Sequence, residues 1–303
     1  MVDPKKHHFS PVFYLKGWCD TNSKIVEYSR PYKKVVAKPV SPEATGFRPL
    51  LYTLEGATDE QKQDIEKKYM APFVDNRGAM ALKILIDRDG DKLTDDVRSD
   101  WTRFLLASEY RGPQKIASMA EIFAARLKEN LNSDPRNYAA IKGSEAATPY
   151  EWIEKNEPHL VQDAARHAAI GSIESQKAGD IIFNMKWSTF DLGNSKHELL
   201  TSDAPLLRTT GLIKPDSLIA FPLNPRFLFV ATHDRKEEAA LLSCGESAIV
   251  KWVNDNIVRG AAQYVFAKTA GHLRFIENRL GLPGTLGPII PPYRRVTSPV
   301  FAL

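Results

Sequence analysis

The chain has 303 residues, of which 43% are hydrophobic, so it can bury a large core as one large domain or two ordinary ones. Its 41 Lys and Arg against 37 Asp and Glu permit contact with nucleic acid, but they do not form the dense basic stripe of a dedicated binder. No apolar run approaches the ~20 residues of a membrane span, and the basic N-terminus lacks the apolar core of a secretory signal. We therefore expect a soluble cytoplasmic protein with no membrane contact.

The number and spacing of the cysteines also suit a cytoplasmic protein. Cys19 and Cys244 are the only two cysteines, and they lie far apart in the sequence. This spacing argues against a disulfide scaffold and against a thiolate zinc site, so we expect two buried thiols.

The stretch from Lys5 to Cys19 sets two adjacent histidines before an aromatic run and a proline. Pro11 lacks an N–H and favours extended conformation in the residue before it. The pattern predicts an extended segment over His7–Ser10 and a short helix or turn through Leu15.

Short strands are expected next. Alternating polar and apolar residues predict strands at 24–29 and around 35–36, and a further short strand is expected at 50–53 after an irregular loop over 38–49.

The middle of the chain is predicted to be helical, because capping residues precede apolar residues spaced three and four apart. The predicted helices begin after Thr58 with a break at Pro72, run over 76–86, begin after Thr94 and end at Arg111, run over 114–131, begin after Thr148, and run from Pro158 to about Gln176. The polar stretch 130–144 is expected to be mostly linker.

The pattern changes after Gly179. Segments 181–188, 199–202, 218–221 and 226–232 read as strands that could share one antiparallel sheet. Gly245 opens a last long helix, whose apolar face is predicted to include Tyr264 and Val265. Beyond Leu282, proline and glycine predict an irregular tail.

Adjacent histidines on an extended backbone point to opposite faces, so only one of His7 and His8 can readily join a given site. We favour His8, because imidazole near neutral pH serves as a general base or a metal ligand. The alternative is structural: both rings pack among aromatic residues and hydrogen-bond to the backbone.

Asp203 follows Ser202 at the end of a predicted strand, where a rigid frame can present a polar side chain. The alternative is an Asx or Ser turn before Pro205. A Ser-His-Asp hydrolase is disfavoured, because the sequence has no Gly-x-Ser-x-Gly motif.

Two further polar residues are candidates. Arg111, at the end of a helix, could bind phosphate or carboxylate, or could simply complement the helix dipole. Asn254 lies close to the apolar face of the last helix, where a buried amide could orient a site residue or tie the helix to a loop.

Several motifs together resemble a bacterial family of uncharacterised proteins whose members open with a His-His-Tyr-Val-Pro-Gln-Phe-Tyr-Leu-like signature. The motifs are His7-His-Phe-Ser-Pro-Val-Phe-Tyr-Leu-Lys, Arg111-Gly-Pro113, Thr201-Ser-Asp-Ala-Pro205, Phe221-Pro-Leu-Asn-Pro225, and Asn254 followed by Ala261 and Tyr264. Ser10, Val12 and Ala204 stand where the family pattern favours valine, glutamine and asparagine. The resemblance implies no established activity, and a site that used the glutamine and asparagine would be altered in this protein.

These patterns predict one α+β domain over 1–303, with an N-terminal motif and short strands (1–57), a predominantly helical middle (58–178), and a C-terminal antiparallel sheet with a closing long helix and tail (179–303). The leading functional hypothesis is a phosphodiester-cleaving enzyme that acts on nucleic acid, with a divalent metal ion as an option. In it, His8 is base or metal ligand, Asp203 orients His8 or binds metal, Arg111 holds phosphate, and His7 and Asn254 support the site. The competing hypothesis is a non-catalytic binding or assembly protein, with partners unknown, in which the same residues are structural pins.

Overall fold

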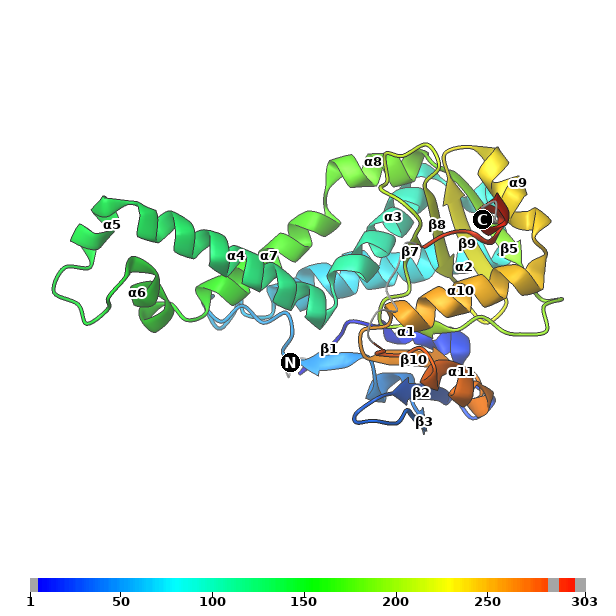
Figure 1. The fold of residues 1–303 in the computed structure, drawn as a ribbon, viewed down its shortest axis with the longest axis horizontal. Helices are drawn as coiled ribbons and strands as arrows, with labels where there is room; N and C mark the ends of the chain where they lie inside the picture. Colours follow the sequence, from blue (N-terminus) through cyan, green and yellow to red (C-terminus); the bar gives the residue numbers. More distant parts are fainter. Residues whose placement is uncertain (1–4, 283–288, 298–303) are drawn as a thin grey trace, which may run out of the picture.

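The computed structural model describes residues 5–282 and 289–297, and the rest of the predicted irregular tail lies outside these ranges. The fold is α+β, as predicted, and these residues form helices and three antiparallel sheets (Figure 1). Within the described ranges, no helix has the length and apolarity that crossing a membrane requires. Cys19 and Cys244 are free thiols that are half-buried, less buried than expected.

The largest part of the core surrounds a four-stranded sheet with the strand order β5 (Lys186–Asp191), β9 (Phe227–Thr232), β8 (Leu218–Pro222) and β7 (Leu207–Arg208). Side chains alternate between its two faces. One face packs against helix α3 (Asp95–Tyr110), and the other packs against helix α10 (Glu246–Gly260). The residues on the α3 face are Ile219, Phe221, Phe229 and Ala231, and those on the α10 face are Leu218, Ala220, Leu228 and Val230. The sheet therefore separates two apolar cores.

The second sheet joins distant parts of the chain in the order β3 (Val36–Val40), β2 (Ile25–Ser29), β10 (Tyr264–Ala267) and β6 (Thr201–Ser202). The prediction that 199–202 shares a sheet with 218–221 is therefore wrong. The predicted helical position of Tyr264 and Val265 is also wrong, because both lie in β10. A third, two-stranded sheet pairs β1 (Lys6–His8) with β4 (Phe47–Pro49).

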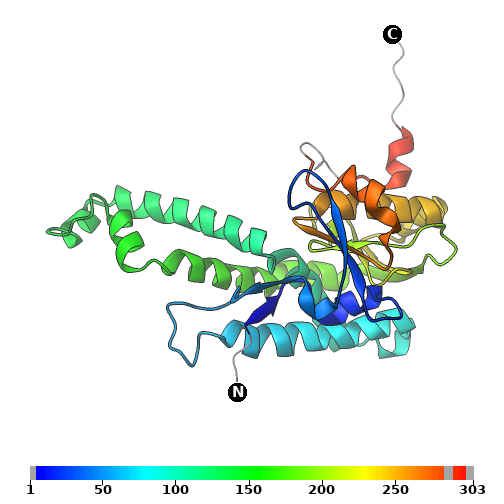
Figure 2. The ribbon, with the colours of Figure 1, turned by 90° about the horizontal axis from the view of Figure 1, so that it is seen from below.

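The remaining elements complete the architecture. They are α1 (Val12–Leu15), η1 (Lys16–Trp18), η2 (Pro42–Ala44), η3 (Ile65–Asn76), α2 (Arg77–Asp87), η4 (Gly90–Lys92), α3 (Asp95–Tyr110), α4 (Pro113–Ser133), α5 (Pro135–Ala140), α6 (Pro149–Asn156), α7 (Leu160–Ile173), α8 (Gln176–Asn184), α9 (Arg235–Ser243), α10 (Glu246–Gly260), η5 (Ala270–His272), α11 (Leu273–Glu277) and η6 (Pro292–Thr297). Helices α4 to α7 form an arm that projects away from the sheets in both views (Figures 1 and 2).

The structure also corrects the predicted bounds of three shorter segments. The predicted strand 181–188 begins only at Lys186, because Ser175 caps α8 and the helix continues through Asn184. The predicted loop 38–49 contains most of β3 as well as η2 and β4, and the predicted strand 50–53 is a turn. Pro72 does not break its helix, because the segment is a π-helix, η3, that runs directly into α2.

The aromatic run after the two histidines anchors the N-terminal segment to both four-stranded sheets. The Tyr14 hydroxyl donates to the Pro222 carbonyl at 2.8 Å and so accepts from the Thr201 hydroxyl at 2.6 Å. The Trp18 indole donates to the Leu199 carbonyl at 3.0 Å. Because Pro222 ends β8 and Thr201 begins β6, this segment fixes the two sheets relative to each other.

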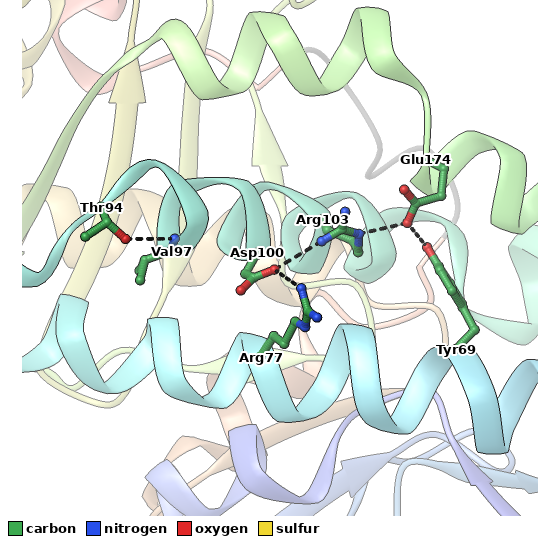
Figure 3. A network of polar contacts seen from close by, with 7 residues as sticks. All are labelled: Tyr69, Arg77, Thr94, Val97, Asp100, Arg103 and Glu174. Atoms are coloured by element: carbon green, nitrogen blue, oxygen red, sulfur yellow. Dashed lines mark hydrogen bonds and ion pairs between the residues drawn. The ribbon is translucent and has the colours of Figure 1, made fainter.

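A polar network holds η3 and α2 against α3 (Figure 3). Asp100 accepts from Arg103 at 3.2 Å and from Arg77 at 3.5 Å, and Arg103 donates on to Glu174 at 2.8 Å. Tyr69, on η3, also donates to Glu174. The helix that carries Tyr69 is thus connected to α3 at several points, which positions the residues described next.

Candidate functional site

Arg111 immediately follows α3 and is 1% exposed. Its guanidinium forms a two-point ion pair with Asp75, with Nη1 to Oδ1 at 2.6 Å and Nη2 to Oδ2 at 3.2 Å. Nη2 also donates to the backbone carbonyl of His8 at 2.7 Å. Burial alone would lower the pKa of Arg111, but Asp75 and Tyr52 raise it above its usual value, so the side chain is a fixed cation.

Tyr52 connects Arg111 to the first histidine. Its hydroxyl donates to the Arg111 carbonyl at 2.9 Å, and its backbone N–H donates to Nδ1 of His7 at 2.9 Å. The His7 and Tyr52 rings stack with centroids 5.5 Å apart. His7 is fully buried, and its Nδ1 is an acceptor here, so a neutral His7 carries its proton on Nε2. Burial raises the pKa of Tyr52 to about 12, which keeps the phenol neutral.

His8 points away from His7, as the alternation along an extended strand predicts. Its ring lies 5.5 Å from that of Phe47, and its Nε2 is buried without a hydrogen-bond partner among the described residues. Burial lowers the pKa of His8, Arg111 adds to this effect, and a backbone contact with Glu43 opposes it. His8 is therefore a neutral imidazole near pH 7.

Glu66 is the residue that the sequence analysis missed. It lies on η3 with Asp75, and its Oε2 is buried without a hydrogen-bond partner in the described structure. Burial raises the pKa of Glu66 to about 7, the nearby cation of Arg111 opposes the rise, and Asp75 adds to it. At neutral pH the carboxyl can therefore be present in its protonated form.

The backbone of η3 explains why no sequence pattern revealed this pair. Glu66 and Asp75 are nine residues apart, which in an α-helix of 3.6 residues per turn puts them about two and a half turns apart, on opposite faces. In a π-helix the hydrogen bonds run from i to i+5, so each turn holds more residues. The wider turn brings both carboxyl groups within electrostatic reach of Arg111.

The Asp203 carboxylate binds the backbone of the segment that connects α10 to β10. Its Oδ1 accepts from the backbone N–H of Ala262 at 2.8 Å, and its Oδ2 accepts from those of Gln263 at 2.7 Å and Tyr264 at 3.0 Å. Burial raises the pKa of Asp203 to about 6 against the opposing effect of these amides. The carboxylate therefore ends the preceding helical segment and starts the strand.

Asn254 lies buried on α10, and its side chain hydrogen-bonds to two backbone groups of the segment before β6. Its Oδ1 accepts from the backbone N–H of Leu200 at 2.8 Å, and its Nδ2 donates to the Glu198 carbonyl at 2.9 Å. This is the arrangement expected of an amide that ties its helix to a neighbouring segment.

The five predicted residues thus fall into two groups. His7, His8 and Arg111 are brought together by Tyr52 and the ion pair, and we name His8, Tyr52, Glu66, Asp75 and Arg111 the Arg111 cluster. Asp203 and Asn254 instead bond to backbone groups of residues 198–200 and 262–264.

The predicted metal site at His8 and Asp203 has no matching donor set in the described part of the chain. Both carboxylate oxygens of Asp203 accept from backbone amides, and no group of three or more His, Cys, Asp or Glu residues there could hold a metal ion.

Comparison with protein families assigns the chain to one of them. Residues 6–271 match the family described as Protein of unknown function (DUF4238), and the chain belongs to that family. No curated protein and no solved structure gave a match.

Proposed function

We propose that the protein is an enzyme that cleaves phosphodiester bonds, acting on nucleic acid, with His8 as the general base. The observation that carries the proposal is the pair of buried, unpartnered atoms, Nε2 of His8 and Oε2 of Glu66, both within the electrostatic influence of the Arg111 cation. Residues with perturbed pKa values that flank a fixed charge are characteristic of active sites.

The chemistry follows from the protonation states. Neutral His8 can take the proton of the attacking hydroxyl or water, and protonated Glu66 can give a proton to the leaving oxygen. Phosphoryl transfer places the attacking and leaving oxygens in line on opposite sides of phosphorus, which suits an acid and a base on separate elements. Glu66 is thus the general acid that acts together with the general base His8. His7 supports the site by fixing β1, the strand that carries His8.

Arg111 takes a different role from the one expected of a phosphate-binding arginine. Its Nη1 and Nη2 donate to Asp75 and His8, while its Nε has no partner among the described residues. We propose that Arg111 is a positioning residue, which holds the His8 backbone in place and adds positive charge to the site.

The choice of nucleic acid as substrate rests on charge and one aromatic side chain. Residues 5–48 contain nine Lys and Arg and only three Asp and Glu. Tyr32 is 88% exposed in the turn between β2 and β3, beside the exposed Lys33 and Lys34. A stacking ring among lysines suits single-stranded nucleic acid, and β3 leads through η2 into β4, the partner of the strand that carries His8.

The test is cleavage of fluorescent single-stranded RNA and DNA oligonucleotides, with Mn²⁺ and separately with EDTA. We expect His8→Gln and Glu66→Gln each to lower the rate 10²- to 10⁴-fold. The controls are His167→Gln and Glu60→Gln, at exposed positions. No cleavage of either oligonucleotide under both conditions, or full activity in both variants, would refute the proposal. Loss of activity in EDTA alone would restore the metal-dependent version.

A second candidate function is a non-catalytic binding or assembly protein. The observation that favours it is that Arg111, Asp203 and Asn254 make internal hydrogen bonds typical of structural pins. It predicts that replacing His8, Arg111, Asp203 or Asn254 lowers stability first, and that His8→Gln and Glu66→Gln change no rate of oligonucleotide cleavage.

The proposal also includes the cytoplasm as compartment and a bacterial origin of the motif set. The first is supported by the free thiols of Cys19 and Cys244, and the second by the His-His signature in β1 and α1.

A further inference from the structure

The outer face of α10 lines a cavity of about 1080 Å³, remote in sequence from the Arg111 cluster. Most of the lining residues on this helix recur at three- and four-residue steps, namely Ala248, Lys251, Trp252, Asp255, Asn256 and Arg259, and Asn254 and Gly260 also line the cavity. The opposite face of the helix, which includes Val250, Val253 and Ile257, is fully buried against the sheet. The cavity is closed on another side by Phe275 of α11 and by Arg279, and α11 lies beside α10 in both views (Figures 1 and 2).

Positive charge is concentrated in this cavity. Asp255 accepts from Nε of Arg259 at 2.9 Å and from Nε of Arg279 at 2.7 Å. Burial would raise the pKa of Asp255, but the two guanidinium groups outweigh it and hold the pKa below its usual value. One ionised carboxylate therefore holds two arginines side by side, and Lys251 adds a third cation, so positive charge exceeds negative charge among these four residues.

Donors remain available on these cations. Nη1 of Arg279 donates to the Phe275 carbonyl at 3.0 Å, and the guanidinium lies 3.9 Å from the centre of the Phe275 ring. Within the described residues, Nη1 and Nη2 of Arg259, Nη2 of Arg279 and Nζ of Lys251 have no partner. Terminal guanidinium nitrogens and an ammonium group are the donors that bind phosphate oxygens best.

The cavity also has apolar walls. Trp252, which is 3% exposed, is one of the lining residues. Leu206, Leu207 and Ile289 line the same space. Its volume is slightly above the range of about 300–1,000 Å³ usual for ligand sites that combine apolar walls with a few polar groups.

We propose that this cavity is a binding site for a small organic phosphate, with Lys251, Arg259 and Arg279 on the phosphate and Trp252 beside the organic part. Asp255 is a positioning residue, which orients both arginines. The site is separate from the Arg111 cluster, and the proposal does not depend on the proposed phosphodiesterase activity.

The experiment is isothermal titration calorimetry of the full chain with adenosine diphosphate, with inorganic pyrophosphate and with adenosine. We expect the two phosphate compounds to bind, adenosine to bind far more weakly, and Lys251→Gln to weaken phosphate binding roughly tenfold, the loss of one charge-assisted hydrogen bond. Lys251 is exposed, so this variant keeps the fold, and Lys83→Gln on α2 is the matched control.

A second variant separates charge from packing. Arg279→Gln removes a cation and one contact to Asp255, and we expect it to weaken binding at least tenfold, with folding checked by thermal unfolding. The proposal is overturned if neither phosphate compound binds at millimolar concentration, or if both bind equally to wild type and to Lys251→Gln. Equal affinity for adenosine and adenosine diphosphate would also overturn it.

Discussion

The buried Arg111 guanidinium forms a two-point ion pair with the partly exposed Asp75 and also donates to the backbone of His8, in the strand that carries the two histidines. The pair unites three segments that are far apart in the chain: β1, η3 and the end of α3. Because Arg111 is buried, removing Asp75 would leave its charge uncompensated, so the stability of this region depends on both partners.

Asp75→Asn is expected to lower the free energy of unfolding by about 2–3 kcal/mol, because asparagine keeps an acceptor for Arg111 but removes the compensating charge. The measurement is urea denaturation at pH 7. The control is Asp64→Asn, which removes an exposed ion pair with Lys68 on the same helix and should cost under about 1 kcal/mol. Equal losses in the two variants would show that Asp75 does not compensate the buried charge of Arg111.

Glu66 should make stability depend on pH. Its pKa of about 7 in the folded protein lies above the usual 4.5, so the protonated carboxyl is compatible with burial and its ionisation is not. Its contribution to stability is therefore complete below about pH 4.5 and is lost as the pH rises through 7.

Glu66→Gln, which stays neutral, should consequently be more stable than wild type by about 2–4 kcal/mol at pH 8 and nearly equal to it at pH 4.5. Denaturation at both pH values measures this difference. Glu60→Gln at an exposed position should show no such change. If Glu66→Gln were no more stable than wild type at pH 8, the pKa of the Glu66 carboxyl would not be raised in the folded protein.

Asp203→Asn is expected to cost about 2–4 kcal/mol, because one carboxamide oxygen cannot replace two carboxylate oxygens and the new NH₂ group would face backbone donors. Thermal or urea unfolding checks the loss, and Asp87→Asn, at the exposed end of α2, serves as control. If Asp203 instead acted on substrate, the variant would lose activity with its stability intact.

Much of the fold could be predicted from local signals. Thr94 and Thr148 were identified as caps, and each accepts the backbone N–H three residues later. The hairpin of β8 and β9 follows from its apolar runs and the turn between them. These features depend on a few neighbouring residues, so sequence alone contains the information.

The site depends on information that local patterns do not contain. The prominence of His7, His8 and Arg111 was visible in the sequence, and the structure does connect them. Glu66 looked like an ordinary acidic residue in a first helical turn, because only the π-helix and the burial around Arg111 change its pKa. Strand β10 was missed because Asp203, about sixty residues earlier, ends the helical pattern there.

The two asparagines of α10 offer a controlled test of a structural pin. The Asn254 side chain hydrogen-bonds to the backbone of Leu200 and Glu198, in the segment that leads into β6. The Asn256 side chain donates only to the Trp252 carbonyl within its own helix. Alanine raises helix propensity similarly at both positions, so that effect cancels in the comparison.

Asn254→Ala should therefore lower the free energy of unfolding by about 2 kcal/mol more than Asn256→Ala, because it leaves the buried N–H of Leu200 without an acceptor. Urea unfolding of both variants measures the difference, and hydrogen exchange at the Leu200 amide should accelerate only in Asn254→Ala. Since Leu200 directly precedes β6, that acceleration would show the strand opening locally once its tie to α10 is removed. Equal unfolding energies with unchanged exchange at Leu200 would mean that Asn254 does not hold this connection.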